Sequence, residues 1–98
     1  MTYIDPCKVS PNEYKLLFED DQVRVVEMTL PAGVRDAEHS HPDEVVYFIK
    51  GGKARIEVGD DSMEAEVPDG HVMAHGPWTH RVENIGTTDI HAIIFERK

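Results

Sequence analysis

Short apolar stretches separated by turn residues follow one another along most of this chain of 98 residues. Gly, Pro or Asp stands at most of the junctions, and no stretch after the first thirteen residues has a helical period. Short strands at such regular spacing predict an all-β barrel or sandwich. The expected strands are 16–19, 22–30, 44–50, 53–58, 62–67, 71–75, 80–85 and 89–97.

Three local patterns refine this prediction. Within 22–30 the apolar alternation changes phase at Val26, which predicts a bulge or a strong bend. The run 44–50 is almost continuously apolar, as in a strand buried on both faces. Gly51 and Gly52 then predict a tight hairpin turn into the next strand.

A candidate metal site stands out between the expected strands. His39 and His41 are two residues apart and therefore share one face of an extended segment. With the nearby carboxylate of Glu44 and the distant imidazole of His80, they make a nitrogen and oxygen ligand set suited to a transition metal. The alternative is that these histidines lie on a solvated surface by chance.

The residues around these ligands resemble the first motif of the cupin superfamily. That motif has a glycine, five residues, two histidines one residue apart, three or four residues, a glutamate, and an apolar strand that ends in glycine. Gly33, His39, His41, Glu44 and Gly51 follow that order. Two residues separate His41 from Glu44, one fewer than the usual minimum, while the spacing from Glu44 to Gly51 fits the family.

The second cupin motif is similar to the series Gly70, Pro77, His80 and Asn84. The interval from Gly70 to His80 is one residue short, and Trp78 stands near the expected inner glycine. The two motifs together cover roughly residues 33–84, which is most of the chain.

The resemblance implies a small cupin-type double-stranded β-helix, or jelly-roll barrel, over residues 14–98, preceded by an N-terminal arm of residues 1–13. It also implies one divalent transition metal per chain (Fe, Mn, Ni or Zn) in the mouth of the barrel. The implied ligands are His39, His41, Glu44 and His80.

Apolar strand residues would form the wall of a pocket beside this metal, unless they simply fill the core. Tyr47 is a candidate hydrogen-bond donor to a bound oxyanion, and Trp78 is the favoured contact for a ligand. The expected wall residues are Val46, Phe48, Ile56, Met73, Trp78, Ile93 and Phe95.

The remaining histidines are weaker candidates. His75 precedes His80 by five residues and could act at the pocket rim as an acid or base, or as a partner of a ligand; otherwise it is an exposed residue. His71 follows Gly70 in a turn and is expected at the surface. His91, in the last strand, is expected to pack in the core or at the surface.

The composition limits the cellular locations and the classes of partner that are expected. The formal net charge of −9 argues against a nucleic-acid partner, which requires clustered Lys and Arg. No apolar run approaches the length that spans a bilayer, and the first residues lack the features of a signal peptide. A single cysteine, Cys7, fits a reducing cytoplasm.

A homodimer is expected from the N-terminal arm. The arm lacks the periodicity to form a core of its own, yet it and the residue after it carry Tyr3, Ile4, Val9 and Tyr14. A chain this short makes a modest core, so these side chains could be buried against a second subunit. The alternative is a frayed terminus.

Three classes of function remain open. The first is an enzyme with a mononuclear metal that oxygenates, isomerises or hydrolyses a small metabolite. The second is a pocket that binds or senses a small molecule without changing it. The third is a metal with a purely structural role, which a ligand set without cysteine makes less favourable. No residue names a substrate.

Overall fold

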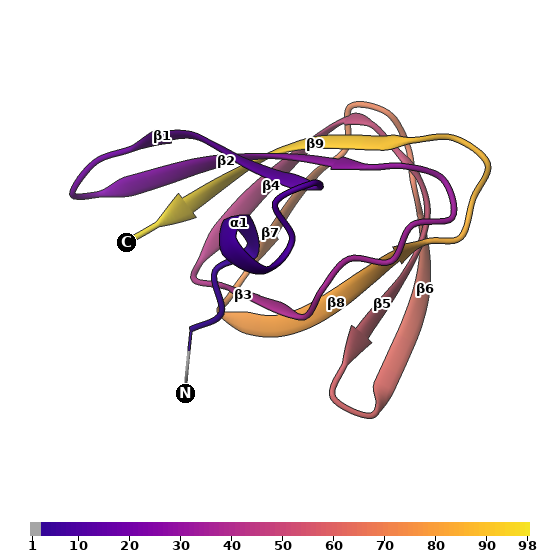
Figure 1. Cartoon of the computed structure of the whole chain (residues 1–98). Coiled ribbons are helices and arrows are strands. Elements are labelled where there is room, and N and C mark those ends of the chain that lie inside the picture. Colours follow the sequence, from indigo (N-terminus) through magenta and orange to yellow (C-terminus); the bar gives the residue numbers. More distant parts are fainter. Residues whose placement is uncertain (1–2) are drawn as a thin grey trace.

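Two antiparallel sheets face each other and enclose the core in the computed structural model, which describes residues 3–98 (Figure 1). The five-stranded sheet has the order β1–β2–β9–β4–β7, and the four-stranded sheet has the order β3–β8–β5–β6. The predicted all-β fold is confirmed. The elements are α1 (Pro6–Val9), β1 (Tyr14–Glu19), β2 (Val23–Leu30), β3 (His39–His41), β4 (Glu44–Lys50), β5 (Gly52–Val58), β6 (Asp61–Val67), β7 (Val72–His75), β8 (Trp78–Asn84) and β9 (Ile90–Arg97).

Strands β2 and β9 supply most of the buried apolar side chains between the sheets. They pair continuously from Val23 opposite Arg97 to Leu30 opposite Ile90. Because side chains alternate along a strand, every second residue of each points inward. The buried apolar residues are Tyr14, Val26, Met28, Leu30, Val46, Ala54, Ile90, Ala92 and Ile94.

The bulge expected within 22–30 is not in that strand. Pairing between β2 and β9 runs without a shift, and the irregularity lies in β1, between Leu16 and Phe18. The change of phase has another cause: Val23 faces outward, whereas Val26 is fully buried. A strand with apolar residues on both faces gives the same sequence pattern as a bulged strand.

The predicted hairpin at Gly51 and Gly52 is also wrong. Strand β4 belongs to the five-stranded sheet, and β5 pairs with β6 and β8 in the other sheet. The two glycines therefore carry the chain from one sheet to the other. A Cβ atom on Gly51 would lie 1.9 Å from the carbonyl oxygen of Val67, so no side chain fits at this crossing.

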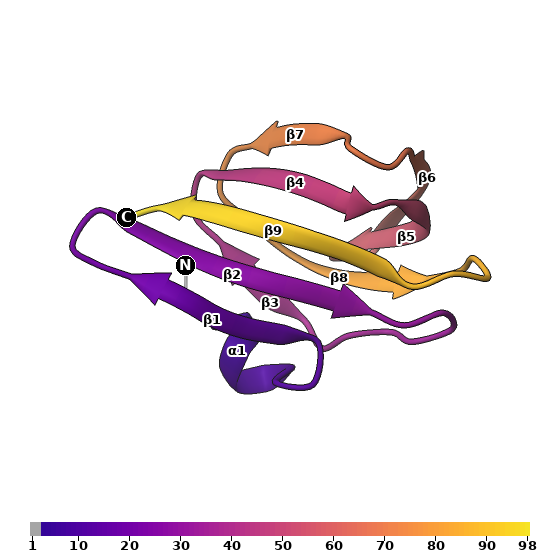
Figure 2. The ribbon, with the colours of Figure 1, turned by 90° about the horizontal axis from the view of Figure 1, so that it is seen from above.

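Strand β4 is buried on one face only, contrary to the sequence-based expectation. Glu44 and Val46 are buried, but Val45, Tyr47 and Ile49 are 41 to 44% exposed. These three side chains lie on the outer face of the five-stranded sheet, which Figure 2 shows without any described segment crossing it.

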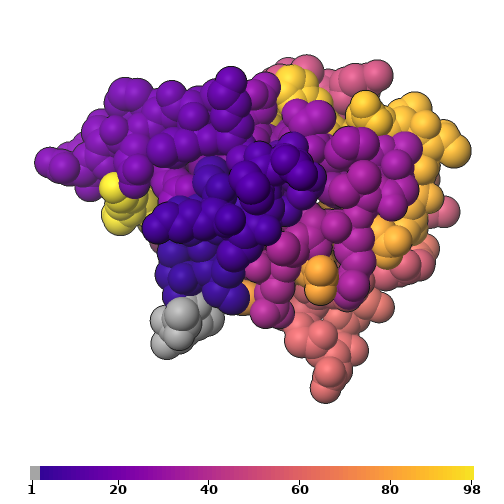
Figure 3. Space-filling view, viewed as in Figure 1, coloured from indigo at the N-terminus to yellow at the C-terminus, as the bar shows by residue number. Residues whose placement is uncertain are grey.

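The N-terminal arm packs against its own barrel. It contains the short helix α1, capped by the Asp5 side chain, where an irregular segment was expected. The Ile4 amide donates to Ser40 Oγ at 3.0 Å, and the Ser40 amide donates to the Ile4 carbonyl at 2.7 Å. In Figure 3 the arm, in indigo, lies against the magenta segment that contains β3. Tyr14 is buried within the chain, so it is not free to pack on a neighbour.

Asn84, the last residue of β8, fastens the loops at one end of the barrel. It is fully buried, and its side-chain amide donates to the carbonyls of Leu30 and Thr88. Its Oδ1 accepts from the Gly86 amide at 3.0 Å. The asparagine of the second motif thus has a structural role, away from the histidines.

Among the described residues, no helix has the length and apolar character to cross a membrane.

Candidate metal centre

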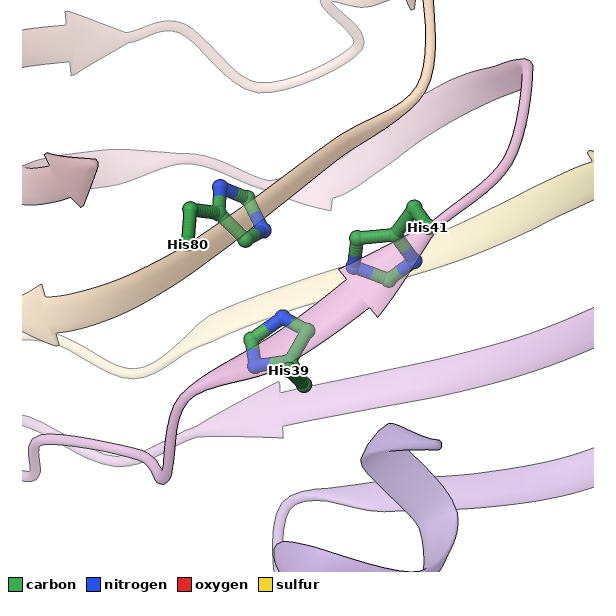
Figure 4. A group of neighbouring side chains, drawn as sticks. All are labelled: His39, His41 and His80. Carbon is green, nitrogen blue, oxygen red and sulfur yellow. The ribbon is translucent and has the colours of Figure 1, made fainter. Parts of the chain in front are cut away.

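Three histidines meet between β3 and β8 (Figure 4). His39 and His41 project from the same face of β3, as the spacing predicted, and His39 is the cross-strand partner of His80. All three are buried, at 0, 3 and 6% exposure. One ring nitrogen from each lies within 4.8 Å of the others, which is close enough for all three to ligate one ion.

Several nitrogens in this cluster have no hydrogen-bond partner. Nε2 of His39 and both ring nitrogens of His80 are buried and unpaired within the described part of the chain. A buried polar atom without a partner costs free energy, so such groups call for an explanation. A metal ion at the meeting point of the rings would supply the missing partner. The residues present therefore fit a metal.

The tautomers of the two β3 histidines also suit ligation. Nδ1 of His39 lies 2.7 Å from the carbonyl oxygen of Ala37, which can only accept a hydrogen bond. Nδ1 therefore carries the proton, and the Nε2 lone pair is left for an ion. Nδ1 of His41 lies 2.5 Å from Glu96 Oε2 and donates to that carboxylate, which leaves Nε2 of His41 as the ligand atom.

Two of the ligands, His41 and His80, strongly favour the neutral imidazole. Burial, with the neighbouring His39, lowers the pKa of His41 to about 3. Burial, with His39 and His41 beside it, lowers the pKa of His80 to about 2. Since a metal binds the neutral ring, these two ligands are ready to bind at any pH near neutrality, with no proton to lose.

Glu96 is a residue of the candidate site that the sequence analysis missed. It is 1% exposed, and burial raises the pKa of its carboxyl to about 7. Besides its bond to His41, it lies 3.9 Å from Nε of Arg24, which in turn pairs with Asp5 of the arm. The alternation of β9 contained the signal, because Glu96 continues the inward series of Ile90, Ala92 and Ile94.

A second buried carboxyl supports His39. Asp36 Oδ2 lies 3.7 Å from Nδ1 of His39 and accepts the hydroxyl proton of Tyr14 at 2.6 Å. Asp36 Oδ1 accepts from the Val82 amide at 2.8 Å. Burial raises the pKa of Asp36. The rings of Tyr14 and His39 are also in contact, with centroids 4.8 Å apart, so His39 is held on two sides.

Glu44 does not belong to the group of mutually close ligand atoms. It is buried at the start of β4, and its Oε2 accepts the indole N–H of Trp78 at 2.6 Å. Burial, only partly offset by this bond, raises its pKa to about 7. Glu44 shares a cavity wall with His41 and His80, so ligation by Glu44 stays a prediction.

This cavity, of about 240 Å³, lies between the sheets and touches the histidine cluster. Five of the expected wall residues line it: Val46, Phe48, Ile56, Met73 and Trp78. The other expected residues point away. Ile93 and Tyr47 face each other across β9 and β4 on the outer face, and Phe95 is 47% exposed there. Their assignment to the pocket is corrected: the parity of the strands places them outside.

His75 lies outside the cavity. It is exposed, its ring stacks on that of Trp78 at 3.6 Å, and its Nδ1 bonds to the Gly76 carbonyl. The Trp78 ring in turn contacts His80, with centroids 4.1 Å apart. His75 therefore contacts the site through Trp78, and it is also the cross-strand partner of Glu44. His91 faces outward and bonds to Glu27.

Solved structures share this architecture. A cupin domain from Bordetella pertussis Tohama I superposes with a TM-score of 0.79 at 23% identity, covering 87% of this chain and 91% of that one. This chain has the cupin fold. An RmlC-like cupin family protein with a double-stranded β-helix fold from Methanocaldococcus jannaschii gives a TM-score of 0.68 at 16% identity, covering 86% and 77%.

A third cupin structure extends the comparison. A cupin-2 domain containing protein from Shewanella frigidimarina gives a TM-score of 0.58 at 15% identity, covering 87% of this chain and 79% of that one. Neither a protein-family model nor a curated protein matches the sequence. The predicted jelly-roll barrel is thus confirmed, and the cupin resemblance is confirmed as a likeness of fold.

Replacing His41 and His80 together with alanine is expected to abolish metal binding and leave a folded β protein. Two of three ligands are lost, while the apolar core between the sheets is unchanged. Elemental analysis after metal loading, with circular dichroism as the folding check, measures the effect. The matched control is His71→Ala with His91→Ala, which removes two histidines outside the cluster. Equal metal content in both double variants would contradict the assignment.

Glu96→Gln is expected to weaken metal affinity by roughly 10- to 100-fold, the usual effect of losing a carboxylate behind a histidine ligand. The amide keeps the size of the side chain but cannot supply the negative charge to Nδ1 of His41. Competition with a chelator of known affinity measures the change. Glu64→Gln, on the exposed side of β6, is the control. Identical affinities in the two variants would show that Glu96 does not act on the metal site.

Proposed function

We propose that this protein holds one divalent transition metal (Fe, Mn, Ni or Zn) through His39, His41 and His80, and that the ion binds a small molecule in the adjacent cavity. The observation that carries this proposal is the set of buried imidazole nitrogens without a hydrogen-bond partner. His41 and His80 also line the adjacent cavity, whose described lining residues include no cysteine. Ions of this kind commonly take five or six ligands, so positions would remain for water or a ligand.

When bound, such an ion would act as a Lewis acid toward an oxygen atom of the ligand. The chain's own residues would orient the molecule and move its protons. Glu44 is suited to the second task, because Trp78 holds one of its oxygens and its raised pKa lies near neutrality. The apolar wall would exclude water from both groups. A place for Glu44 as fourth metal ligand is the alternative use of the same carboxylate.

Two functions are compatible with this arrangement. The protein is either an enzyme of the oxygenase, isomerase or hydrolase class, or a module that binds or senses a small metabolite. The enzyme is favoured by the buried carboxyl of Glu44, which lines the same cavity as His41 and His80, since storage alone requires no proton carrier. Consumption of a bound metabolite would distinguish the two.

The remaining expectations concern the cellular location of the protein and the role of the metal. A cytoplasmic location is proposed from Cys7, a free thiol that a reducing compartment would preserve. A purely structural metal is disfavoured, because the histidine rings of β3 and β8 border a cavity rather than a closed shell of side chains.

The open position is tested by adding nitric oxide to anaerobic, Fe(II)-loaded protein. A spin-quartet ferrous nitrosyl signal in electron paramagnetic resonance is expected, because three imidazoles leave coordination positions free. The variant that lacks His41 and His80 is the control and should give no protein-bound signal. A loaded wild-type protein that shows no nitrosyl would have a closed shell, and the structural role would then replace the proposed one.

A further inference from the structure

The cavity beside the histidine cluster has two chemically distinct parts. Among its polar side chains, His41 and His80 belong to the histidine cluster, and Glu44 and Trp78 are bonded to each other beside it. Glu66 and His71 also line the cavity. The rest of the wall is almost entirely apolar, with Met28, Val46, Phe48, Ile56, Met73 and Ile94 among its members. A ligand in this space would therefore place one polar group on the ion and an apolar body against the wall.

The charges of the wall restrict the ligand further. The carboxylates that line the cavity are those of Glu44 and Glu66, and no Lys or Arg is among the described lining residues. Outside the histidine cluster, His71 is the basic side chain of this lining. The nearest buried cation, Arg24, is paired with Asp5 and Glu96 outside the cavity. A carboxylate or phosphate away from the ion would thus lose part of its water and meet two carboxylates but no Lys or Arg, which is unfavourable.

The volume limits the size of the ligand. About 240 Å³ corresponds to roughly eight water molecules at about 30 Å³ each. Pockets for drug-sized ligands start at about 300 Å³, so the molecule is smaller than these.

From these three observations we infer that the ligand class is a small molecule with a single metal-binding head and an apolar, non-anionic body. This inference rests on the proposed function, because the head requires the ion. It excludes dicarboxylates, sugar phosphates and nucleotides, which carry negative charge at a distance from any single metal-binding group.

Hydroxamates test the inference because their head binds metal ions while their tail can be varied. Cobalt-loaded protein is titrated with acetohydroxamate, butanohydroxamate and the monohydroxamate of succinic acid, and binding is read from the cobalt absorption bands. The last two probes have tails of equal length that end in a methyl group or a carboxylate. Butanohydroxamate is expected to bind at least about tenfold more tightly than either of the others.

The second measurement uses a variant in which a cation is added to the cavity wall. Met73→Lys keeps an unbranched side chain of similar length on the cavity wall and adds a cation, so the preference for the methyl tail should shrink or reverse. Met63→Lys, at an exposed position of β6 that is not part of the cavity lining, is the control and should keep the wild-type preference.

The outcomes distinguish a failure of the inferred ligand class from a failure of the proposed open metal ion. Tighter binding of the succinyl probe by the wild-type protein, or no gain from the propyl tail of butanohydroxamate, overturns the ligand class while the open ion stands. If acetohydroxamate leaves the cobalt bands unchanged, the open ion itself is contradicted and the ligand class falls with it.

Discussion

Three imidazoles lie buried between two sheets, and three of their ring nitrogens are buried without a hydrogen bond. This is unfavourable in an apolar interior, and the surrounding residues do not relieve it. Instead, Ala37 and Glu96 each accept the proton of one ring and thereby aim the opposite nitrogen into the cluster. The neighbouring residues thus orient the ring nitrogens toward one another and leave them without hydrogen bonds. A metal ion at this point is the simplest explanation for the arrangement.

The fold supplies the rigidity that such a cluster needs. Strand β3 has three residues and is stabilised from both edges, by β8 and by the arm through Ile4 and Ser40. A chain of polar contacts runs from His41 through Glu96 and Arg24 to Asp5. The arm and the last strand therefore both help to position His41. The site therefore depends on residues far apart in the sequence.

The sequence predicted the parts of the structure that follow from local period. Alternation and turn residues gave the strands, and the spacing of His39 and His41 gave their common face. It failed where pairing over long distances decides. The glycines after β4 read as a hairpin but cross between sheets, and Tyr47 read as a pocket residue but lies on the outer face. Glu96 was visible as an inward-facing residue, yet only the fold shows that it meets His41.

X-ray absorption of the metal-loaded protein tests the central claim most directly, because the outer-shell scattering of imidazole rings distinguishes histidine from oxygen ligands. The account predicts three imidazoles around one ion, with oxygen atoms in the remaining positions, and no imidazole in the variant that lacks His41 and His80. A wild-type spectrum with only oxygen ligands, or with a single imidazole, would place the metal elsewhere and contradict the account.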